Sequence, residues 1–441
     1  MPWVPPALSA RVERFARRSA TAVRLDELYK WGRGDAQVRL HFARFLHKEI
    51  AIRNAQLCKE LKLLPFGLSE TRGVNAVISW FSSYVDSLVD FPKPETLEDE
   101  QRFSGLLARI LEDNQQVPAT LGRGVQEVRE ARGEDYYEDI RSEVDLIMDR
   151  FFIKRIGLRF LIQHHIASAK AKPGVSGIIH SHVAVGPVLR QAAREAQELC
   201  FQKYGMTPEI IIVGDGTESG IHSGSLGTSL SDLDLSYDRQ FTYVPIHLQF
   251  SCSVLLQNAC FAVAELHGGL AKTLPPVEAI FAYGEDEVTI KVADEGGGIP
   301  LSDLPYAWSY FRAPGGSQIE PGRGRRHSTP LGAQNPEGAG LPLARLHARY
   351  YGGDLVLKPI NGYGTDSYLM LNRLGIDCEK LPHGVRVSPA MRDSSVGDEA
   401  SFRLDSLGNV TELEVSFLKR RLSEYRKNRE AETALLSMNT P

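Results

Sequence analysis

A carboxylate followed directly by three glycines is the feature of this sequence that most clearly suggests chemistry. Asp294 comes just after the strand-like run 288–292 and precedes Glu295 and the glycines at 296–298. Glycine allows the backbone to come close to a ligand, while the carboxylate of Asp294 is able to accept a hydrogen bond from it. A glycine-rich turn after a strand is more often simply a turn, so the neighbouring segments decide its meaning.

Three further segments accompany this loop, each with the pattern of a regular element. A nearly unbroken apolar run predicts a helix around Asn258, two glycines precede a second helical pattern, and apolar runs on both sides of a turn predict a hairpin. In chain order the elements are the helix 247–266, the strand 288–292 with its loop, Gly338 and Gly340 before the helix 343–350, and the strands 354–357 and 365–371 around the turn 361–364.

In this order the elements resemble the asparagine box, the two glycine boxes and the final Gly-Thr element of the GHKL ATPases, the fold of gyrase, sensor histidine kinases and MutL. The resemblance implies that the chain binds ATP. It also implies that Asp294 accepts from the adenine amino group and that Asn258 holds Mg²⁺, for which one amide oxygen beside the triphosphate is sufficient. The implied ATP-binding residues are Asn258, Asp294, Gly296, Gly298, Gly338, Gly340, Leu341 and Thr365.

The N-terminal half narrows this resemblance to one family. The segment 149–165, DRFFIKRIGLRFLIQHH, is similar to the mitochondrial 2-oxo acid dehydrogenase kinases, and the resemblance covers roughly residues 35–375. The family includes kinases of pyruvate dehydrogenase and of branched-chain 2-oxo acid dehydrogenase, and the segments 155–159 and 203–205 slightly favour the branched-chain kinase. Shorter similar segments lie at 64–66, 78–81, 244–248 and 364–366.

The resemblance implies a reaction, a partner and a compartment. The reaction is the Mg-ATP-dependent phosphorylation of a serine on the decarboxylase subunit of the dehydrogenase, which switches the complex off. The implied enzyme is a homodimer in the mitochondrial matrix that docks on lipoyl domains of the acyltransferase core. Neither nucleic-acid binding nor a transmembrane segment is expected, because the net charge is −4 and no apolar run approaches the ~20 residues that span a bilayer.

The residues that assist phosphoryl transfer in this family are absent from the sequence. In the family, a glutamate four residues before the metal-binding asparagine acts as the general base, and a histidine in the helical half orients it. The corresponding residues here are Val254 and Asn114, so no catalytic residue is assigned. Because the loss of a general base typically costs ~10²–10⁴ in rate, the alternative interpretation is a pseudokinase that acts as a nucleotide-binding regulator or partner.

Other charged positions leave alternatives open. Gln257 and Phe261 stand where the family carries a lysine and an arginine. The arginines of the segment 312–337 either replace these contacts to phosphate or belong to a solvated loop. That segment is rich in glycine and proline and is expected to form a lid over the ATP site. Glu265 lies on the predicted Asn258 helix, but eleven residues after Val254 and away from the family's base position.

Periodicity divides the chain into an all-helical first domain and an α/β second domain. Asp35 is expected to cap the first long helix, and no strand pattern appears before about residue 207. We therefore predict an α+β protein with a four-helix bundle and a GHKL-type α/β sandwich, whose mixed sheet carries helices on one face. The predicted segments are a mitochondrial transit peptide at 1–25, the bundle at 26–175, the ATP-binding kinase domain at 176–375 and a tail with one helix at 376–441.

The N-terminal segment, the cysteines and the remaining predicted helices and strand give further expectations. The first 25 residues hold five arginines and the single acid Glu13, which fits either a transit peptide or a disordered basic tail, and the family resemblance favours targeting. Five cysteines without paired or metal-like spacing indicate a reducing compartment and no zinc site. The remaining predicted helices lie near 75–90, 100–116, 121–131, 140–170 and 186–204, and a strand is predicted at 210–213.

Overall fold

The structure is a computed structural model, and it describes residues 8–65, 67–170, 172–214, 221–222, 241–268, 273–284, 287–311, 338–373, 379–382 and 386–387. The described residues up to Val387 pack as one compact unit. The predicted lid at 312–337 and the predicted tail helix lie outside the described residues. The predicted division near residue 175 stays a prediction, because the described residues on both sides of it belong to the same unit.

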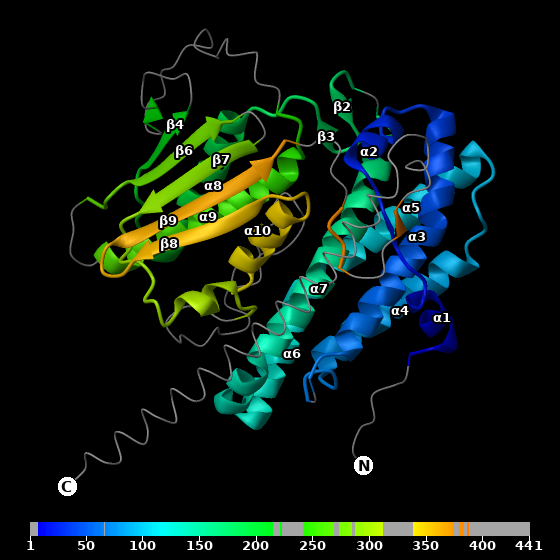
Figure 1. Cartoon of the computed structure of the whole chain (residues 1–441), viewed down its shortest axis with the longest axis horizontal. Helices are drawn as coiled ribbons and strands as arrows, with labels where there is room; N and C mark the ends of the chain where they lie inside the picture. The colour runs from blue at the N-terminus through cyan, green and yellow to red at the C-terminus, as the bar shows by residue number, and fades with distance from the viewer. Residues whose placement is uncertain are drawn as a thin grey trace, which may run out of the picture. The chain divides into compact units, whose positions relative to one another are not determined.

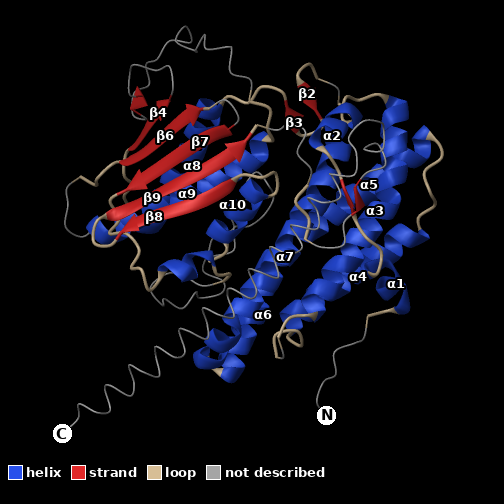
Figure 2. Cartoon of the chain, in the orientation of Figure 1, coloured by secondary structure: helices blue, strands red, loops and turns tan. Residues whose placement is uncertain are grey.

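The N-terminal part of this unit is built from helices, which Figures 1 and 2 show as a group separate from the main sheet. Helix α3 packs against α4, α5 and α7, and α6 packs against α4 and α7, so these helices share one apolar core. The elements of this helical region are α1 (Ala10–Ala16), α2 (Leu25–Trp31), α3 (Ala36–Lys62), α4 (Arg72–Asp90), α5 (Leu97–Asp113), the 3₁₀ turn η1 (Asn114–Gln116), α6 (Val117–Arg132) and α7 (Glu134–Ala167).

Capping residues fix the ends of these helices. The carboxylate of Asp35 accepts from the backbone N–H groups of Gln37 and Val38, at 2.9 Å each, which confirms the predicted cap of α3. Thr96 begins α5 with a capping box, in which its hydroxyl and the carboxylate of the third helical residue satisfy each other's backbone N–H groups. Gly133, with φ of +89°, ends α6 and allows the chain to turn directly into α7.

The C-terminal part combines a six-stranded sheet with three helices. The strand order is β5-β4-β6-β7-β9-β8, and β4 and β6 are parallel whereas the other neighbours are antiparallel. Helices α8, α9 and α10 pack on one face of this mixed sheet, as Figure 2 shows. The elements of this α/β region are α8 (Val185–Tyr204), β4 (Ile210–Gly214), β5 (Ile221–His222), α9 (Pro245–His267), β6 (Val277–Tyr283), β7 (Glu287–Asp294), η3 (Leu304–Trp308), α10 (Gly340–Arg349), β8 (Asp354–Ile360) and β9 (Gly364–Asn372).

This layout confirms the predicted α+β class, and it corrects two details of the prediction. Short strands do occur before residue 207: β1 (Thr21–Ala22), and the hairpin of β2 (Val175–Ser176) and β3 (Ile179–His180). Each has only two residues, too few to produce a visible alternation of apolar and polar side chains. The seven-residue strand β6 was not predicted individually, although it alternates in burial and lies in the middle of the sheet.

Helix α9 explains the longest apolar run of the sequence. Among the described helices it alone is long and apolar enough to cross a bilayer, so the prediction that no run approaches this length was wrong for α9. Most of the apolar stretch is buried within the protein, where α9 packs against α8, α10 and β7. Its composition therefore belongs to the core helix of the α/β region.

The N-terminal segment from residue 8 onward is folded. Val12 and Phe15 of α1 are buried, and α1 packs against α3 and α4. Further along, β1 pairs in parallel with β10 (Arg386–Val387), so the two ends of the described unit meet. The transit peptide at 1–25 stays a prediction, but removal of all 25 residues would take away α1 and β1.

A buried ionic network holds this meeting point together. Arg53 on α3 is 2% exposed, and its guanidinium donates to Glu379 at 2.7 and 3.2 Å and to Glu49 at 2.9 Å. Glu379 also accepts from the backbone N–H of Val23 and from the hydroxyl of Tyr350. Burial alone would lower the pKa of Arg53, but the two carboxylates outweigh it and hold that pKa well above its ordinary value.

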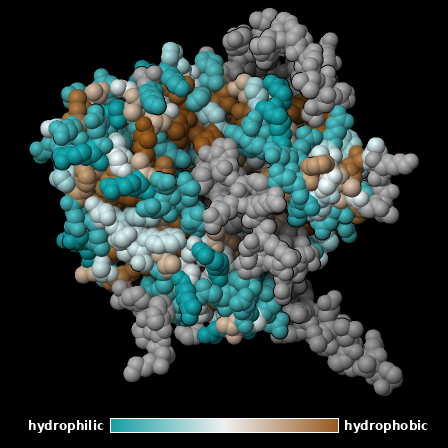
Figure 3. All heavy atoms as spheres, turned by 180° about the vertical axis from the view of Figure 1, so that it is seen from behind, coloured by the Kyte–Doolittle hydropathy of each residue, from teal (hydrophilic) through white to brown (hydrophobic). Residues whose placement is uncertain are grey.

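Hydrophobic residues are scattered over the face of the molecule that Figure 3 shows. On the face shown in Figure 3, the described residues are mostly hydrophilic and the hydrophobic ones form smaller groups. The exposed large hydrophobic residues of the described chain are Leu63, Leu97, Leu146, Phe201, Leu266, Ile280, Leu301, Ile360 and Tyr363.

Candidate functional site

Asp294 stands at the junction of the loop and the sheet. It is the last residue of β7 and pairs in register with Thr365 of β9. Its Oδ1 accepts from the backbone N–H of Gly296 at 2.9 Å and of Thr365 at 3.3 Å. Burial raises the pKa of this carboxyl, and the two N–H donors partly offset that rise. Within the described chain Oδ2 has no hydrogen-bond partner, so it is free to accept from a ligand.

The glycines that follow bring this loop against the helix and the hairpin. A Cβ at residue 296 would lie 2.4 Å from the Cβ of Ala262 on α9. Gly298 has φ of +70°, and a Cβ there would lie 2.2 Å from the carbonyl oxygen of Ile360. The two glycines are therefore required by the protein's own packing, in addition to any approach of a ligand.

Asn258 is an exposed residue in the mostly buried middle of helix α9. It is exposed, whereas residues 251–256, 259 and 260 of the same helix are buried. Its side chain makes no hydrogen bond with any described residue. Ala262, one turn further along, faces the Asp294 loop at Gly296, so Asn258 and Asp294 border the same part of the α/β region.

Some of the predicted ligand-binding residues contact each other in the structure, and others do not. Contacts described above link Asp294 to Gly296 and Thr365, Gly296 to α9, and Gly298 to β8. Gly338, Gly340 and Leu341 lie at the start of α10, which packs against α9, β8 and β9. Among the described residues, no hydrogen bond connects these three with the Asp294 cluster, so their part in one site stays a prediction.

Comparison with known proteins assigns the chain to a family. Residues 22–185 match the sequence profile described as mitochondrial branched-chain alpha-ketoacid dehydrogenase kinase. The mitochondrial pyruvate dehydrogenase (acetyl-transferring) kinase of Arabidopsis thaliana is 33% identical over 385 residues, which are 86% of this chain and 97% of the relative. The Drosophila melanogaster kinase of the same name is 32% identical over 76% of this chain and 78% of its own length. The human isozyme 4 is 31% identical over 84% and 86% of the two chains.

The chain belongs to the mitochondrial 2-oxo acid dehydrogenase kinase family. The relatives are similar to this chain through both the helical and the α/β regions, since the match to the Arabidopsis kinase covers nearly its full length. The family profile covers the helical region only, and it is the branched-chain kinase that it describes. The two comparisons therefore agree on the family and differ on the dehydrogenase that their names specify.

The residue predicted to stand at the family's base position has a buried apolar side chain. Val254 is 2% exposed and belongs to the apolar core around α9. Asn114, at the position of the orienting histidine, is fully buried in η1. Its side-chain and backbone oxygens accept from the guanidinium of Arg155 at 2.8 and 2.6 Å. Asn114 thus serves as an acceptor for an arginine and does not orient a carboxylate.

The described carboxylates of this region lie elsewhere on the helices. Glu195 of α8 accepts from the hydroxyl of Ser253, at 3.2 Å, and from Gln249. Ser253 precedes Asn258 by five residues, so the two side chains point about 140° apart around the helix. Glu195 therefore lies away from the side of α9 that carries Asn258. Glu265 is exposed near the end of α9, two turns beyond Asn258.

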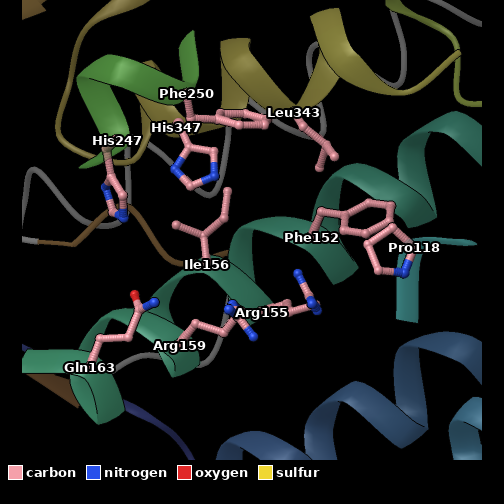
Figure 4. Close-up of a pocket in the computed structure, with 10 residues that line it drawn as sticks. All are labelled: Pro118, Phe152, Arg155, Ile156, Arg159, Gln163, His247, Phe250, Leu343 and His347. Atoms are coloured by element: carbon pink, nitrogen blue, oxygen red, sulfur yellow. The ribbon is translucent and has the colours of Figure 1, made fainter. Parts of the chain in front are cut away.

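A small pocket, partly open to solvent, lies between α7 and the α9–α10 pair (Figure 4). None of the eight predicted ATP-binding residues lines it. Its two histidines are poor bases, because burial lowers the pKa of His247 to about 3 and that of His347 well below its ordinary value. The lining residues are Pro118, Phe152, Arg155, Ile156, Arg159, Gln163, His247, Phe250, Leu343 and His347.

Two acids of α7 that the sequence analysis did not select contact the segment just before residue 312. Asp145 accepts from the hydroxyl of Ser309 at 2.7 Å and from the backbone N–H of Tyr310 at 3.0 Å. Asp149 accepts from the hydroxyl of Tyr310 at 2.6 Å. Burial raises the pKa of Asp145 to about 6, although its hydrogen bonds and the guanidinium of Arg141 oppose the rise. In the sequence, these two acids have the spacing of ordinary solvent-exposed residues on a long helix, so nothing marks them as functional.

The raised pKa of Asp145 predicts a pH-dependent contribution to stability. Between pH 4 and 6 the folded state binds the proton more tightly than the unfolded state, so this contribution is present at low pH and is lost as the pH rises through 6. Across this window the contribution of Asp145 to the free energy of unfolding should fall by about 3 kcal/mol, and Asp145→Asn should abolish this fall. Denaturant unfolding of both proteins at several pH values measures the difference.

The control for this experiment is Asp139→Asn, an exposed acid on the same helix. Relative to wild type, the Asp145→Asn variant should become more stable as the pH rises from 4 to 6, whereas the Asp139→Asn variant should keep a constant difference. Parallel stability curves for Asp145→Asn and wild type would show that Asp145 does not titrate in this range.

Proposed function

We propose that this chain is a Mg-ATP-binding member of its family with a GHKL-type nucleotide domain and a four-helix bundle. The observation that carries the proposal is the pairing of two features of the α/β region. Asp294 is fixed by two backbone N–H groups while its Oδ2 has no partner among the described residues, and Asn258 is exposed in a stretch of α9 whose residues 251–256, 259 and 260 are buried. A fixed acceptor beside an exposed amide fits the adenine amino group and a magnesium ion, respectively.

Different residues of the chain would contact the adenine, the magnesium ion and the phosphates. Asp294 would orient the adenine by accepting its amino hydrogen, and Thr365 lies opposite Asp294 at the start of β9. The amide oxygen of Asn258 would ligate Mg²⁺, which keeps several waters and needs few protein ligands. The backbone N–H groups of Gly338, Gly340 and Leu341, at the start of α10, would contact phosphate oxygens. Mg-ATP supplies the phosphoryl group when it is bound.

The family reaction is the phosphorylation of a serine on the decarboxylase subunit of a 2-oxo acid dehydrogenase complex. The names of the relatives support pyruvate dehydrogenase as the target class, while the profile of the helical region supports the branched-chain complex. We further propose that the protein is a homodimer that docks on the lipoyl domains of the acyltransferase core. We propose the mitochondrial matrix as its compartment, and the relatives are named as mitochondrial kinases.

The second candidate function is that of an impaired kinase that regulates or accompanies an active partner. It is favoured by the buried Val254 at the base position and by Asn114, whose oxygens are occupied by Arg155. The nearby Glu195 and the two pocket histidines do not replace the base, for the reasons of geometry and pKa given above. Nucleotide binding without efficient transfer is the expected behaviour of such a protein.

One pair of measurements separates these candidates. Mg-ATP is titrated into the purified full-length chain, and phosphotransfer to purified pyruvate dehydrogenase and branched-chain complexes is followed in parallel. Saturable binding with transfer supports the kinase, and saturable binding with little or no transfer supports the regulator. An absence of Mg-ATP binding would contradict both.

Asn258→Ala is expected to abolish or strongly weaken the magnesium-dependent part of ATP affinity while the fold survives. The side chain is exposed and has no hydrogen-bond partner in the described chain, so its removal leaves no buried group unsatisfied. The measurement is ATP titration with magnesium and with EDTA, beside a thermal unfolding curve. Equal affinities of variant and wild type in magnesium would mean that Asn258 is only a surface amide.

A further inference from the structure

Three consecutive residues form a segment that the helical region holds firmly. We call Ser309-Tyr310-Phe311 the anchor segment. These residues are 2%, 0% and 4% exposed, although they follow the short turn η3 at the edge of the α/β region. A loop is normally on the surface, so complete burial of three residues requires specific partners.

The partners on α7 are two carboxylates, an arginine and two aromatic side chains. Asp145 accepts from the Ser309 hydroxyl and the Tyr310 backbone N–H, and Asp149 accepts from the Tyr310 hydroxyl, at the distances given above. The ring of Phe152 stacks on that of Tyr310 with centroids 5.2 Å apart. Arg141 also donates to the Ser309 hydroxyl oxygen at 2.9 Å, and the hydroxyl of Tyr137 donates to the Tyr310 carbonyl oxygen at 3.5 Å. Ser309 and Tyr310 are therefore held to α7 by hydrogen bonds in both directions.

Phe311 connects the anchor segment to α6 and to the glycine segment 338–340. It has φ of +62°, the only positive φ of a non-glycine residue in the described chain. Such a conformation is unfavourable and persists only where the surroundings impose it. Gly122 on α6 leaves room for its ring, and the guanidinium of Arg129 donates to its carbonyl oxygen at 2.8 Å. On the other side, its backbone N–H donates to the carbonyl oxygen of Gly338 at 2.8 Å.

We propose that Asp145 and Asp149 are positioning residues for the glycine segment 338–340, acting through the anchor segment. They hold Tyr310, Tyr310 fixes Phe311 between α6 and α7, and Phe311 fixes the carbonyl of Gly338 two residues before α10 begins. A helical region with no predicted nucleotide ligand thereby sets the position of a segment predicted to contact phosphate. The effect on nucleotide affinity rests on the proposed function, whereas the effect on the segment itself does not.

Four variants test this chain of contacts. Asp145→Ala removes both acceptor oxygens, whereas Asp145→Asn retains one. The asparagine variant should therefore hold the anchor segment better than the alanine variant does. Tyr310→Phe keeps the ring stack on Phe152 and removes only the bond to Asp149. Asp139→Ala, on the exposed side of the same helix, is the matched control.

Hydrogen exchange without nucleotide is the first readout. In Asp145→Ala and Tyr310→Phe we expect the amides of Tyr310, Phe311 and the first turn of α10 to exchange about 10-fold faster or more, as for the loss of a hydrogen bond to a charged acceptor. Asp145→Asn should exchange more slowly than Asp145→Ala, and Asp139→Ala should match wild type. Unchanged exchange in both test variants would overturn the proposal.

Mg-ATP titration is the second readout. We expect affinity roughly 5-fold or more weaker in Asp145→Ala and Tyr310→Phe, with Asp145→Asn in between. If exchange accelerates but a wild type that binds Mg-ATP keeps its affinity in the variants, the positioning role is overturned. If exchange accelerates and wild type binds no Mg-ATP, the positioning of the segment is supported and the proposed nucleotide function fails.

Discussion

A double variant, Val254→Glu with Asn114→His, is expected to transfer phosphate up to ~10²–10⁴-fold faster than wild type, the range of general-base assistance. The new glutamate lies one helical turn before Asn258, hence on the same face of α9. By itself it would enter an apolar, buried position and would tend to stay protonated. The family resemblance implies that a histidine at 114 is the partner that keeps it charged, and Arg155 retains the backbone carbonyl of that residue as an acceptor.

Phosphotransfer to the purified dehydrogenase complexes, measured at saturating Mg-ATP, tests this expectation. Val254→Gln with Asn114→His is the matched control, because glutamine has nearly the same shape as glutamate but cannot act as a base. Each single variant should gain less than the double variant, since the two residues act as a pair. A wild type that already works at ordinary kinase rates of ~1–100 s⁻¹ would show that another base exists.

Glu379→Ala is expected to lower the free energy of unfolding by about 3–5 kcal/mol, because it leaves a buried cation without its main partner. Arg53 would keep Glu49 and the carbonyl of Thr21, but it would lose both bonds to Glu379. The Tyr350 hydroxyl and the Val23 N–H would lose their acceptor as well. Denaturant unfolding of the full chain at neutral pH measures the change.

Two further variants serve as controls for Glu379→Ala. Glu379→Gln retains the acceptor oxygen and the shape, so it should destabilise less than the alanine variant. Glu265→Ala removes an exposed carboxylate and should change stability by no more than about 0.5 kcal/mol. A loss of less than about 1 kcal/mol in Glu379→Ala would mean that water or a neighbouring group takes over its bonds.

The sequence allowed the fold class and the main elements to be predicted because their signals are local. The Asp35 cap and the apolar periodicity of α3 lie within a few residues, and both are confirmed. The register that sets Thr365 opposite Asp294 follows from two strands that each carry a recognisable motif. Whether the predicted ATP-binding residues form one site stays a prediction.

The features that could not be predicted depend on contacts between distant segments. Glu379 is a lone acid in the sequence, and its role follows only from its position between Arg53, Val23 and Tyr350. Asp145 has the spacing of an ordinary helix-surface residue, and only the burial of Ser309 and Tyr310 against it reveals its function. Arg53 lies 326 residues from Glu379 and Ser309 lies 164 residues from Asp145, so no periodicity in the sequence could reveal either contact.

The pairing of β1 with β10 has a consequence for the order in which the molecule forms. The bond from the Val23 N–H to Glu379 connects residues 356 apart in the chain. During synthesis, the N-terminal segment therefore cannot complete its contacts until nearly the whole described unit has left the ribosome. Contacts of such long sequence separation slow folding, because the loop must close before they contribute. We expect the helical and α/β regions to fold and unfold as one cooperative unit, and an isolated helical region to leave α1 and β1 unattached.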